Sequence, residues 1–106
     1  MEEKKDYVVN CALNKVQKVI GGKWKLLILW YLLDRPKRFG EIKRAFPDTT
    51  QSMLTKQLRE LEEDNLVHRE VFKEVPPHVE YSLTNLGKGF VPILESMNEW
   101  GQLNLN

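Results

Sequence analysis

Apolar residues in the first third of the chain recur at the spacing of helices. Between residues 11 and 20 they lie three and four positions apart, and Gly21-Gly22 follows as a stop signal. A continuous apolar run then predicts a second helix over about residues 23–33, buried on all sides as the central core element. This helix should end before Pro36, because proline disfavours helical geometry in the residue that precedes it.

Two more helices are predicted on either side of a short turn. Apolar residues at helical spacing over residues 39–46 indicate a short amphipathic helix that ends at Pro47. Thr50 is a good N-cap for the next helix, which should end near residues 64–65. The buried stripe of that helix should be Leu54, Leu58 and Leu61, and its other face should display Gln51, Ser52, Thr55, Lys56 and Arg59.

The periodicity then changes from helical to alternating. Residues 67–73 and 79–83 predict the two strands of a hairpin. Two prolines within the connection, residues 74–78, favour a stiff and projecting tip. The end of the chain predicts a long helix that bends at Pro92. Its apolar residues form a seam like that of a coiled coil, made of Leu86, Phe90, Ile93, Met97 and Trp100.

The chain has 106 residues, which is the length of one domain with a modest core. Its expected class is mainly α with a small β-hairpin, and the order of elements is that of a winged helix-turn-helix. We divide it into a flexible N-terminal arm (1–10), N-terminal and core helices (11–33), a helix-turn-helix (39–64), a wing hairpin (66–84) and a C-terminal dimerisation helix (85–101).

The composition excludes several other classes. Cys11 is the single cysteine, which excludes an internal disulfide and a thiolate metal cluster. The longest apolar run is far shorter than the roughly 20 residues of a membrane span. The charged N-terminus lacks the apolar stretch of a secretion signal. We therefore expect a cytoplasmic protein without a membrane partner.

Charge is strongly segregated along the chain. Residues 15–59 hold eleven lysines and arginines against three acids, a net charge of +8, whereas residues 60–106 carry a net charge of −6. This asymmetry favours a surface that faces a polyanion. Two solvated faces of opposite sign would produce the same pattern.

The helix that begins after Thr50 is the expected DNA-reading element. In a winged helix-turn-helix the second helix of the motif enters the major groove, where polar side chains can bind base edges. Nearby cations can clamp the phosphates. An ordinary helical pair with a wet face is the alternative, but the wing and the local positive charge favour double-stranded DNA. The predicted DNA-contacting residues are Gln51, Ser52, Thr55, Lys56, Arg59, Lys37, Arg38, Lys43, Lys73 and His78, the last of which is otherwise simply solvated.

Four short motifs add to this pattern. They are Val19-Ile20-Gly21-Gly22-Lys23-Trp24, Pro36-Lys37-Arg38-Phe39, Leu58-Arg59-Glu60-Leu61-Glu62 and the run from Val75-Pro76-Pro77 to Glu80-Tyr81-Ser82-Leu83-Thr84. Together they resemble the HxlR-type family of bacterial transcription regulators. The resemblance implies a DNA-binding homodimer whose terminal helices form the dimer contact and whose residues 50–64 read the operator. One departure is Ala12, which stands where family members often have proline.

The apolar seam on the C-terminal helix also favours a two-fold symmetric homodimer. A chain this small can hardly bury such a seam against itself. The first helix should share in the contact, and the operator should then be an inverted repeat. The predicted interface residues are Leu13, Val16, Ile20, Phe90, Ile93, Met97 and Trp100.

Cys11 carries a separate hypothesis. In some members of the family a cysteine at this N-terminal position senses oxidants or electrophiles, and the resemblance implies the same role here. A position near a helix start, one turn before Lys15, favours a lowered thiol pKa. The alternative is a small apolar residue that packs beside the first helix.

Other chemistry finds little support in the sequence. The Gly-Gly-Lys stretch does not complete a phosphate-binding loop, because Gln17 and Trp24 occupy its required glycine and hydroxyl positions. His68 and His78 lack ligand-spaced partners, so no metal site or other cofactor is expected. No nucleophile pattern indicates an enzyme. The competing function is a winged-helix module that binds another protein through its acidic C-terminal half; the identity of any small-molecule effector stays open.

Overall fold

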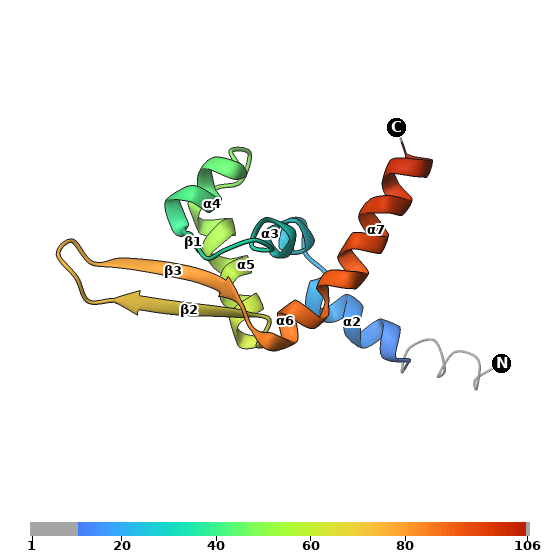
Figure 1. Cartoon of the computed structure of the whole chain (residues 1–106), viewed down its shortest axis with the longest axis horizontal. Coiled ribbons are helices and arrows are strands. Elements are labelled where there is room, and N and C mark those ends of the chain that lie inside the picture. Colours follow the sequence, from blue (N-terminus) through green and yellow to red (C-terminus); the bar gives the residue numbers. More distant parts are fainter. Residues whose placement is uncertain (1–10, 106) are drawn as a thin grey trace.

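The elements of the fold follow the predicted order (Figure 1). The computed structural model describes residues 11–105, and the expected N-terminal arm over residues 1–10 lies outside this range. The helices are α2 (Ala12–Ile20), α3 (Lys25–Tyr31), α4 (Phe39–Ala45), α5 (Gln51–Glu63), α6 (Asn85–Gly89) and α7 (Val91–Asn104). The strands are β1 (Lys37–Arg38), β2 (Val67–Phe72) and β3 (His78–Leu83). The mainly helical class with a wing is therefore confirmed.

The sheet has three strands rather than the two of the predicted hairpin. β2 and β3 pair antiparallel, from Val67 opposite Leu83 to Phe72 opposite His78. β1 adds to the other edge of β3, so that the strand order is β1-β3-β2. Two residues are too few to show an alternating pattern, which is why the sequence did not predict β1. The hairpin projects away from the helices (Figure 1).

The core lies where α3, α4 and α5 meet the base of the hairpin. The predicted leucine stripe of α5 is confirmed, since all three residues are buried. The prediction for α3 was wrong in part. Leu27 is 50% exposed, because neighbouring elements cover only one side of this helix, and Leu33, which lies beyond the end of α3, is 41% exposed. The buried apolar set is Ile28, Leu29, Leu32, Ile42, Leu54, Leu58, Leu61, Leu66, Val67, Tyr81, Leu83 and Leu94.

The C-terminal segment forms two helices, not one bent helix. α6 ends at Gly89, and α7 begins at Val91 with Pro92 in its first turn. Proline suits that position, because the backbone N–H that it lacks would have no partner inside the helix. The restart changes the helical phase, so that Leu94 rather than a residue of the predicted seam is the buried residue of α7. Within residues 11–105, none of the helices is long and apolar enough to cross a membrane.

A tight junction joins the end of α5 to the start of α6. Asn65 has a φ of 62°, which lets the chain turn after the helix, and the Thr84 hydroxyl donates a hydrogen bond of 2.6 Å to the Asn65 carbonyl. The same hydroxyl accepts a bond of 3.0 Å from the Gly87 amide. A Cβ atom at Gly87 would clash with the Leu66 carbonyl oxygen. Only glycine therefore fits where α6 crosses the chain that follows α5.

Candidate nucleic-acid interface

The polar face of α5 gathers five of the predicted contact residues. The Thr50 hydroxyl accepts a hydrogen bond of 3.1 Å from the Met53 amide and so caps the helix, as predicted. Because the leucine stripe is held in the core, the other face of α5 points outward. A shallow and open groove on this face is lined by Gln51, Ser52, Thr55, Lys56 and Arg59.

Further cations lie on α4 and at its start. Arg38 is exposed and immediately precedes α4, and Lys43 is half-buried in the last turn of that helix. Glu41 accepts a hydrogen bond of 3.1 Å from the Arg38 amide, and its Oε2 lies 2.7 Å from Nη2 of Arg35. The Arg35 guanidinium and the Arg38 amide lower the pKa of the Glu41 carboxyl to about 2. Glu41 is thus ionised and caps the start of α4, and the Arg38 side chain stays exposed to solvent.

Lys37 does not belong to this surface, and its prediction as a phosphate contact is corrected. The residue is only 4% exposed. Its Nζ donates hydrogen bonds of 2.8 Å to the Tyr31 carbonyl and to Oδ1 of Asp34, and it lies 4.1 Å from the centre of the Tyr31 ring. Lys37 therefore joins β1 to the end of α3. Since Lys37 and Arg38 are adjacent in a strand, their side chains must point to opposite faces.

Of the two predicted contacts in the wing, Lys73 points to solvent and His78 packs against the hairpin. Lys73 is exposed next to the hairpin tip. The His78 side chain is only 13% exposed and stacks on Phe72, with ring centres 4.7 Å apart. Its Nε2 lies 3.0 Å from Oε2 of Glu80, and its Nδ1 lies 3.5 Å from Oε2 of Glu74. His78 is thus neither freely solvated nor open to a phosphate, and it holds the tip together.

A second set of polar contacts, which the sequence did not predict, lies behind the reading face. The Trp24 amide donates a hydrogen bond of 3.0 Å to Oε1 of Gln57, and Nζ of Lys25 lies 2.9 Å from Oε1 of Glu60. The four residues tie the start of α3 to the middle of α5. Their signal in the sequence is faint: two polar residues three apart, between the leucine stripe and the polar face of one helix.

The predicted dimer residues lie at the end of the molecule away from the wing (Figure 1). Trp100 and Leu13 are 60% and 75% exposed, and Val16, Ile93 and Met97 are also exposed. Ile20 and Phe90 are half-buried and line an apolar cavity of about 440 Å³ between α2 and α6. The structure therefore gathers this set on neighbouring helices with much of its apolar surface in solvent.

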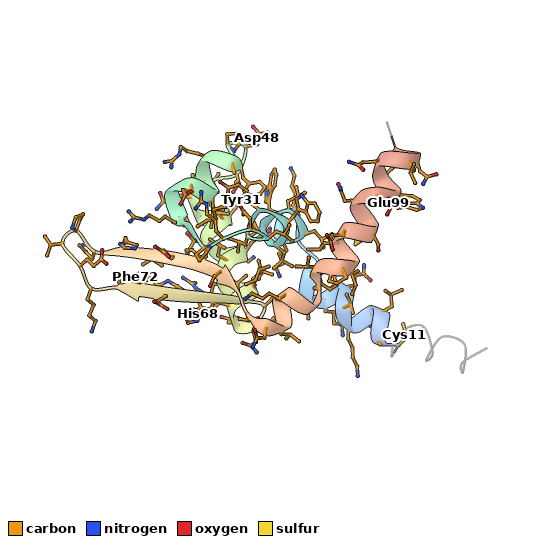
Figure 2. The ribbon with its side chains drawn as sticks, viewed as in Figure 1. Cys11, Tyr31, Asp48, His68, Phe72 and Glu99 are labelled. Atoms are coloured by element: carbon orange, nitrogen blue, oxygen red, sulfur yellow. The ribbon has the colours of Figure 1, made fainter. Side chains whose placement is uncertain are left out.

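Cys11 occupies the N-cap position of α2 and is partly exposed. Its carbonyl accepts a hydrogen bond of 3.1 Å from the Asn14 amide, as expected at a helix start. Figure 2 shows Cys11 at the opposite end of the molecule from Phe72 in the wing. The thiol is therefore remote from the hairpin and close to the apolar end of the fold.

Comparison with known proteins agrees with this arrangement. The family model for the HxlR-like helix-turn-helix matches residues 19–106. The HTH-type transcriptional regulator YybR of Bacillus subtilis (strain 168) is 50% identical over 107 residues, which cover 98% of this chain and 86% of that protein. The redox regulator HypR in its oxidised form superposes with a TM-score of 0.85 at 51% identity, covering 91% of this chain and 99% of HypR.

The crystal structure of the HTH-type transcriptional regulator YtcD superposes with a TM-score of 0.86 at 45% identity, covering 90% of this chain and 97% of that one. These relatives are transcriptional regulators, not enzymes. The similarity extends over nearly the whole chain and includes the helix-turn-helix and the wing. The chain therefore belongs to the HxlR-like helix-turn-helix family of DNA-binding transcriptional regulators.

Proposed function

We propose that this regulator binds an inverted-repeat operator as a homodimer, with α5 of each subunit in a major groove. The observation that carries the proposal is the capped helix α5, whose apolar side is locked in the core while its polar side is open. Ser52 and Lys56 stand on this open side. Hydroxyl and ammonium groups there suit the donors and acceptors of base edges.

The remaining cations are assigned to the phosphates. Arg38 immediately precedes α4, Lys43 lies in the last turn of that helix, and Lys73 is exposed in the wing. Such contacts position a protein on the duplex without reading its sequence. The acids Glu70 and Glu74 of the wing are exposed as well, and their charge repels phosphate. We therefore expect the wing to bind the DNA backbone weakly and the main phosphate contacts to come from α4 and α5.

The dimer is assigned to α2 and α7. Both helices carry exposed apolar side chains at the end of the fold opposite the wing, including Leu13, Ile93, Met97 and Trp100. Exposed apolar patches of this kind mark association surfaces. A two-fold axis there would present two copies of α5 to half-sites one helical turn, or a multiple of it, apart.

The assignment of α5 is tested by comparing specific and random duplexes. The operator is selected from a pool of random duplexes, and affinities are measured by fluorescence anisotropy. Changing Ser52 or Lys56 to Ala should weaken operator binding by about 1–3 kcal/mol more than random binding if a base contact is lost. Lys88→Ala, an exposed lysine on α6, is the control of equal charge for Lys56→Ala. Equal losses on both duplexes would overturn base reading by α5.

We further propose that the regulator responds to oxidants through Cys11. Two observations support this: the partial exposure of Cys11 at the N-cap of α2, and the similarity to HypR, a redox regulator. Cys11 is the only thiol in the chain, so its modification cannot form a disulfide within one subunit. It gives an adduct, or a disulfide with the second subunit or with a small thiol. With diamide as oxidant, two thiols lose two protons and two electrons to form the bond.

The sensor is tested with Cys11→Ser. The variant should bind the operator like the wild type but keep its affinity in diamide, whereas the affinity of the wild type should change and recover with a reductant. Mass spectrometry under non-reducing conditions would identify the disulfide. An identical response of the two proteins to diamide would leave Cys11 as a packing residue.

A further inference from the structure

The back of α5 is held by the first residues of α3. Trp24 precedes the first turn of α3, so its amide has no partner inside that helix, and Gln57 accepts its hydrogen bond at 3.0 Å. Lys25 is 4% exposed and reaches Glu60 at 2.9 Å. Both contacts join α3 to α5, and each is strong only while its donor points at its acceptor.

These contacts lie on the side of α5 that faces α3, away from the reading face. Gln57 and Glu60 are three residues apart and so share one side of α5. Each directly follows a predicted DNA contact, Lys56 or Arg59, and successive residues differ by about 100° around a helix. A rotation of α5 about its axis would therefore move the reading side chains and break both polar contacts together.

The leucine stripe alone would fix the rotation of α5 about its axis less firmly. Apolar burial is non-directional, whereas a hydrogen bond or an ion pair loses strength steeply as its geometry changes. A buried lysine also demands its counter-charge, because an unpaired ammonium in the core is strongly unfavourable. The Lys25 ammonium lowers the pKa of the Glu60 carboxyl, which keeps the pair charged.

The glycines before α3 make this arrangement sterically possible. A Cβ at Gly22 would lie 3.2–3.3 Å from the Lys25 side-chain carbons, which is tighter than an ordinary contact. A Cβ at Gly21 would clash with the Gln17 carbonyl oxygen. The two glycines therefore end α2 at Gly21 and leave room at Gly22 for the Lys25 side chain, which reaches Glu60.

We propose that Gln57 and Glu60 are positioning residues for operator recognition. Through the Trp24 amide and the Lys25 ammonium they set the rotation of α5 about its axis, and so decide which side chains meet the base edges without touching DNA themselves. This inference rests on the proposed reading of the operator by α5.

The test compares Glu60→Ala with Glu63→Ala. Glu63 is an exposed acid on the same helix, so both variants change the net charge equally and should strengthen random binding equally. Glu60→Ala should lower the ratio of operator to random affinity by about tenfold, the effect of misplacing one base contact. Glu63→Ala should leave the ratio unchanged.

Gln57→Ala keeps the ion pair and every charge, and it carries the test if Glu60→Ala fails to fold by circular dichroism. It should lower the ratio in the same direction. In a Ser52→Ala background, Gln57→Ala should lower the ratio of operator to random affinity less than it does alone. A positioning residue acts through the side chain that it orients, so removing that side chain removes part of its effect. A folded Gln57→Ala protein with the wild-type ratio, or with additive losses, would overturn the inference.

Failure of this inference and failure of base reading give different results. If Ser52→Ala and Lys56→Ala lower the ratio while Gln57→Ala and Glu60→Ala do not, α5 reads DNA and the contacts with α3 are structural only. If Ser52→Ala and Lys56→Ala leave the ratio unchanged, base reading by α5 is itself wrong, and the positioning role is overturned with it.

Discussion

Single residues decide which of the many cations of this protein can face DNA. Lys37 and Arg38 are neighbours with the same charge, yet one is 4% exposed beneath Tyr31 and the other is open to solvent. In the wing, the His78 side chain is likewise largely buried while Lys73 is exposed. The net charge of +8 over residues 15–59 therefore overstates the charge available to phosphates.

The burial of one residue and the exposure of the other predict different effects for two adjacent substitutions. Lys37→Ala should lower the free energy of unfolding by about 1–3 kcal/mol, because the Tyr31 carbonyl loses its partner in a covered site. Arg38→Ala should leave stability nearly unchanged but reduce the slope of log affinity against log salt by about one. Urea denaturation and salt titration of operator binding measure the two effects. If Lys37→Ala also reduced the slope, Lys37 would contact phosphate after all.

At the scale of elements, the sequence predicted best where one physical signal acted alone. The Thr50 cap and the leucine stripe define α5 without help from other elements, and both are confirmed. The prediction failed where a neighbour decides the outcome. β1 exists only because β3 offers it an edge, and Leu94 is buried only because the chain restarts a helix at Val91.

The candidate site follows the same division. The five side chains of the α5 groove could be predicted, because a helix with one buried face must expose the other. The burial of Lys37 and the stacking of His78 on Phe72 depend on the tertiary packing of strands. A one-dimensional pattern of charge does not contain that information.

The wing as an element is predicted to bind DNA weakly and without sequence preference. Lys73→Ala should reduce the salt slope by about one and lower affinity equally on operator and random duplexes. The Lys73 side chain is flanked by Glu74 on the tip, so the loss in affinity should be smaller than that of Arg38→Ala. Salt titration of both variants checks this order. A preferential loss on the operator would show that the wing reads bases.

At the scale of the whole molecule, the apolar end predicts a dimer. Light scattering should give twice the chain mass of 12.5 kDa. Trp100→Glu should shift the protein toward the monomer, because Trp100 is 60% exposed within the proposed contact. Gln102→Glu makes the same charge change two residues further along α7, where side chains point another way. A wild-type monomer at working concentration would contradict the proposed dimer.

The junction between α5 and α6 gives such a dimer a fixed span. The Thr84 hydroxyl holds the last turn after α5 and the first turn of α6 at once, and Gly87 leaves no free space against Leu66. The two α5 helices would thus stand at a separation set by the contacts of Thr84 and Gly87 rather than by the side chains that meet DNA. Base preference and half-site spacing are then independent properties: α5 can diverge to suit a new sequence while the operator keeps its length, and a change at Gly87 would alter the length while the sequence preference stays.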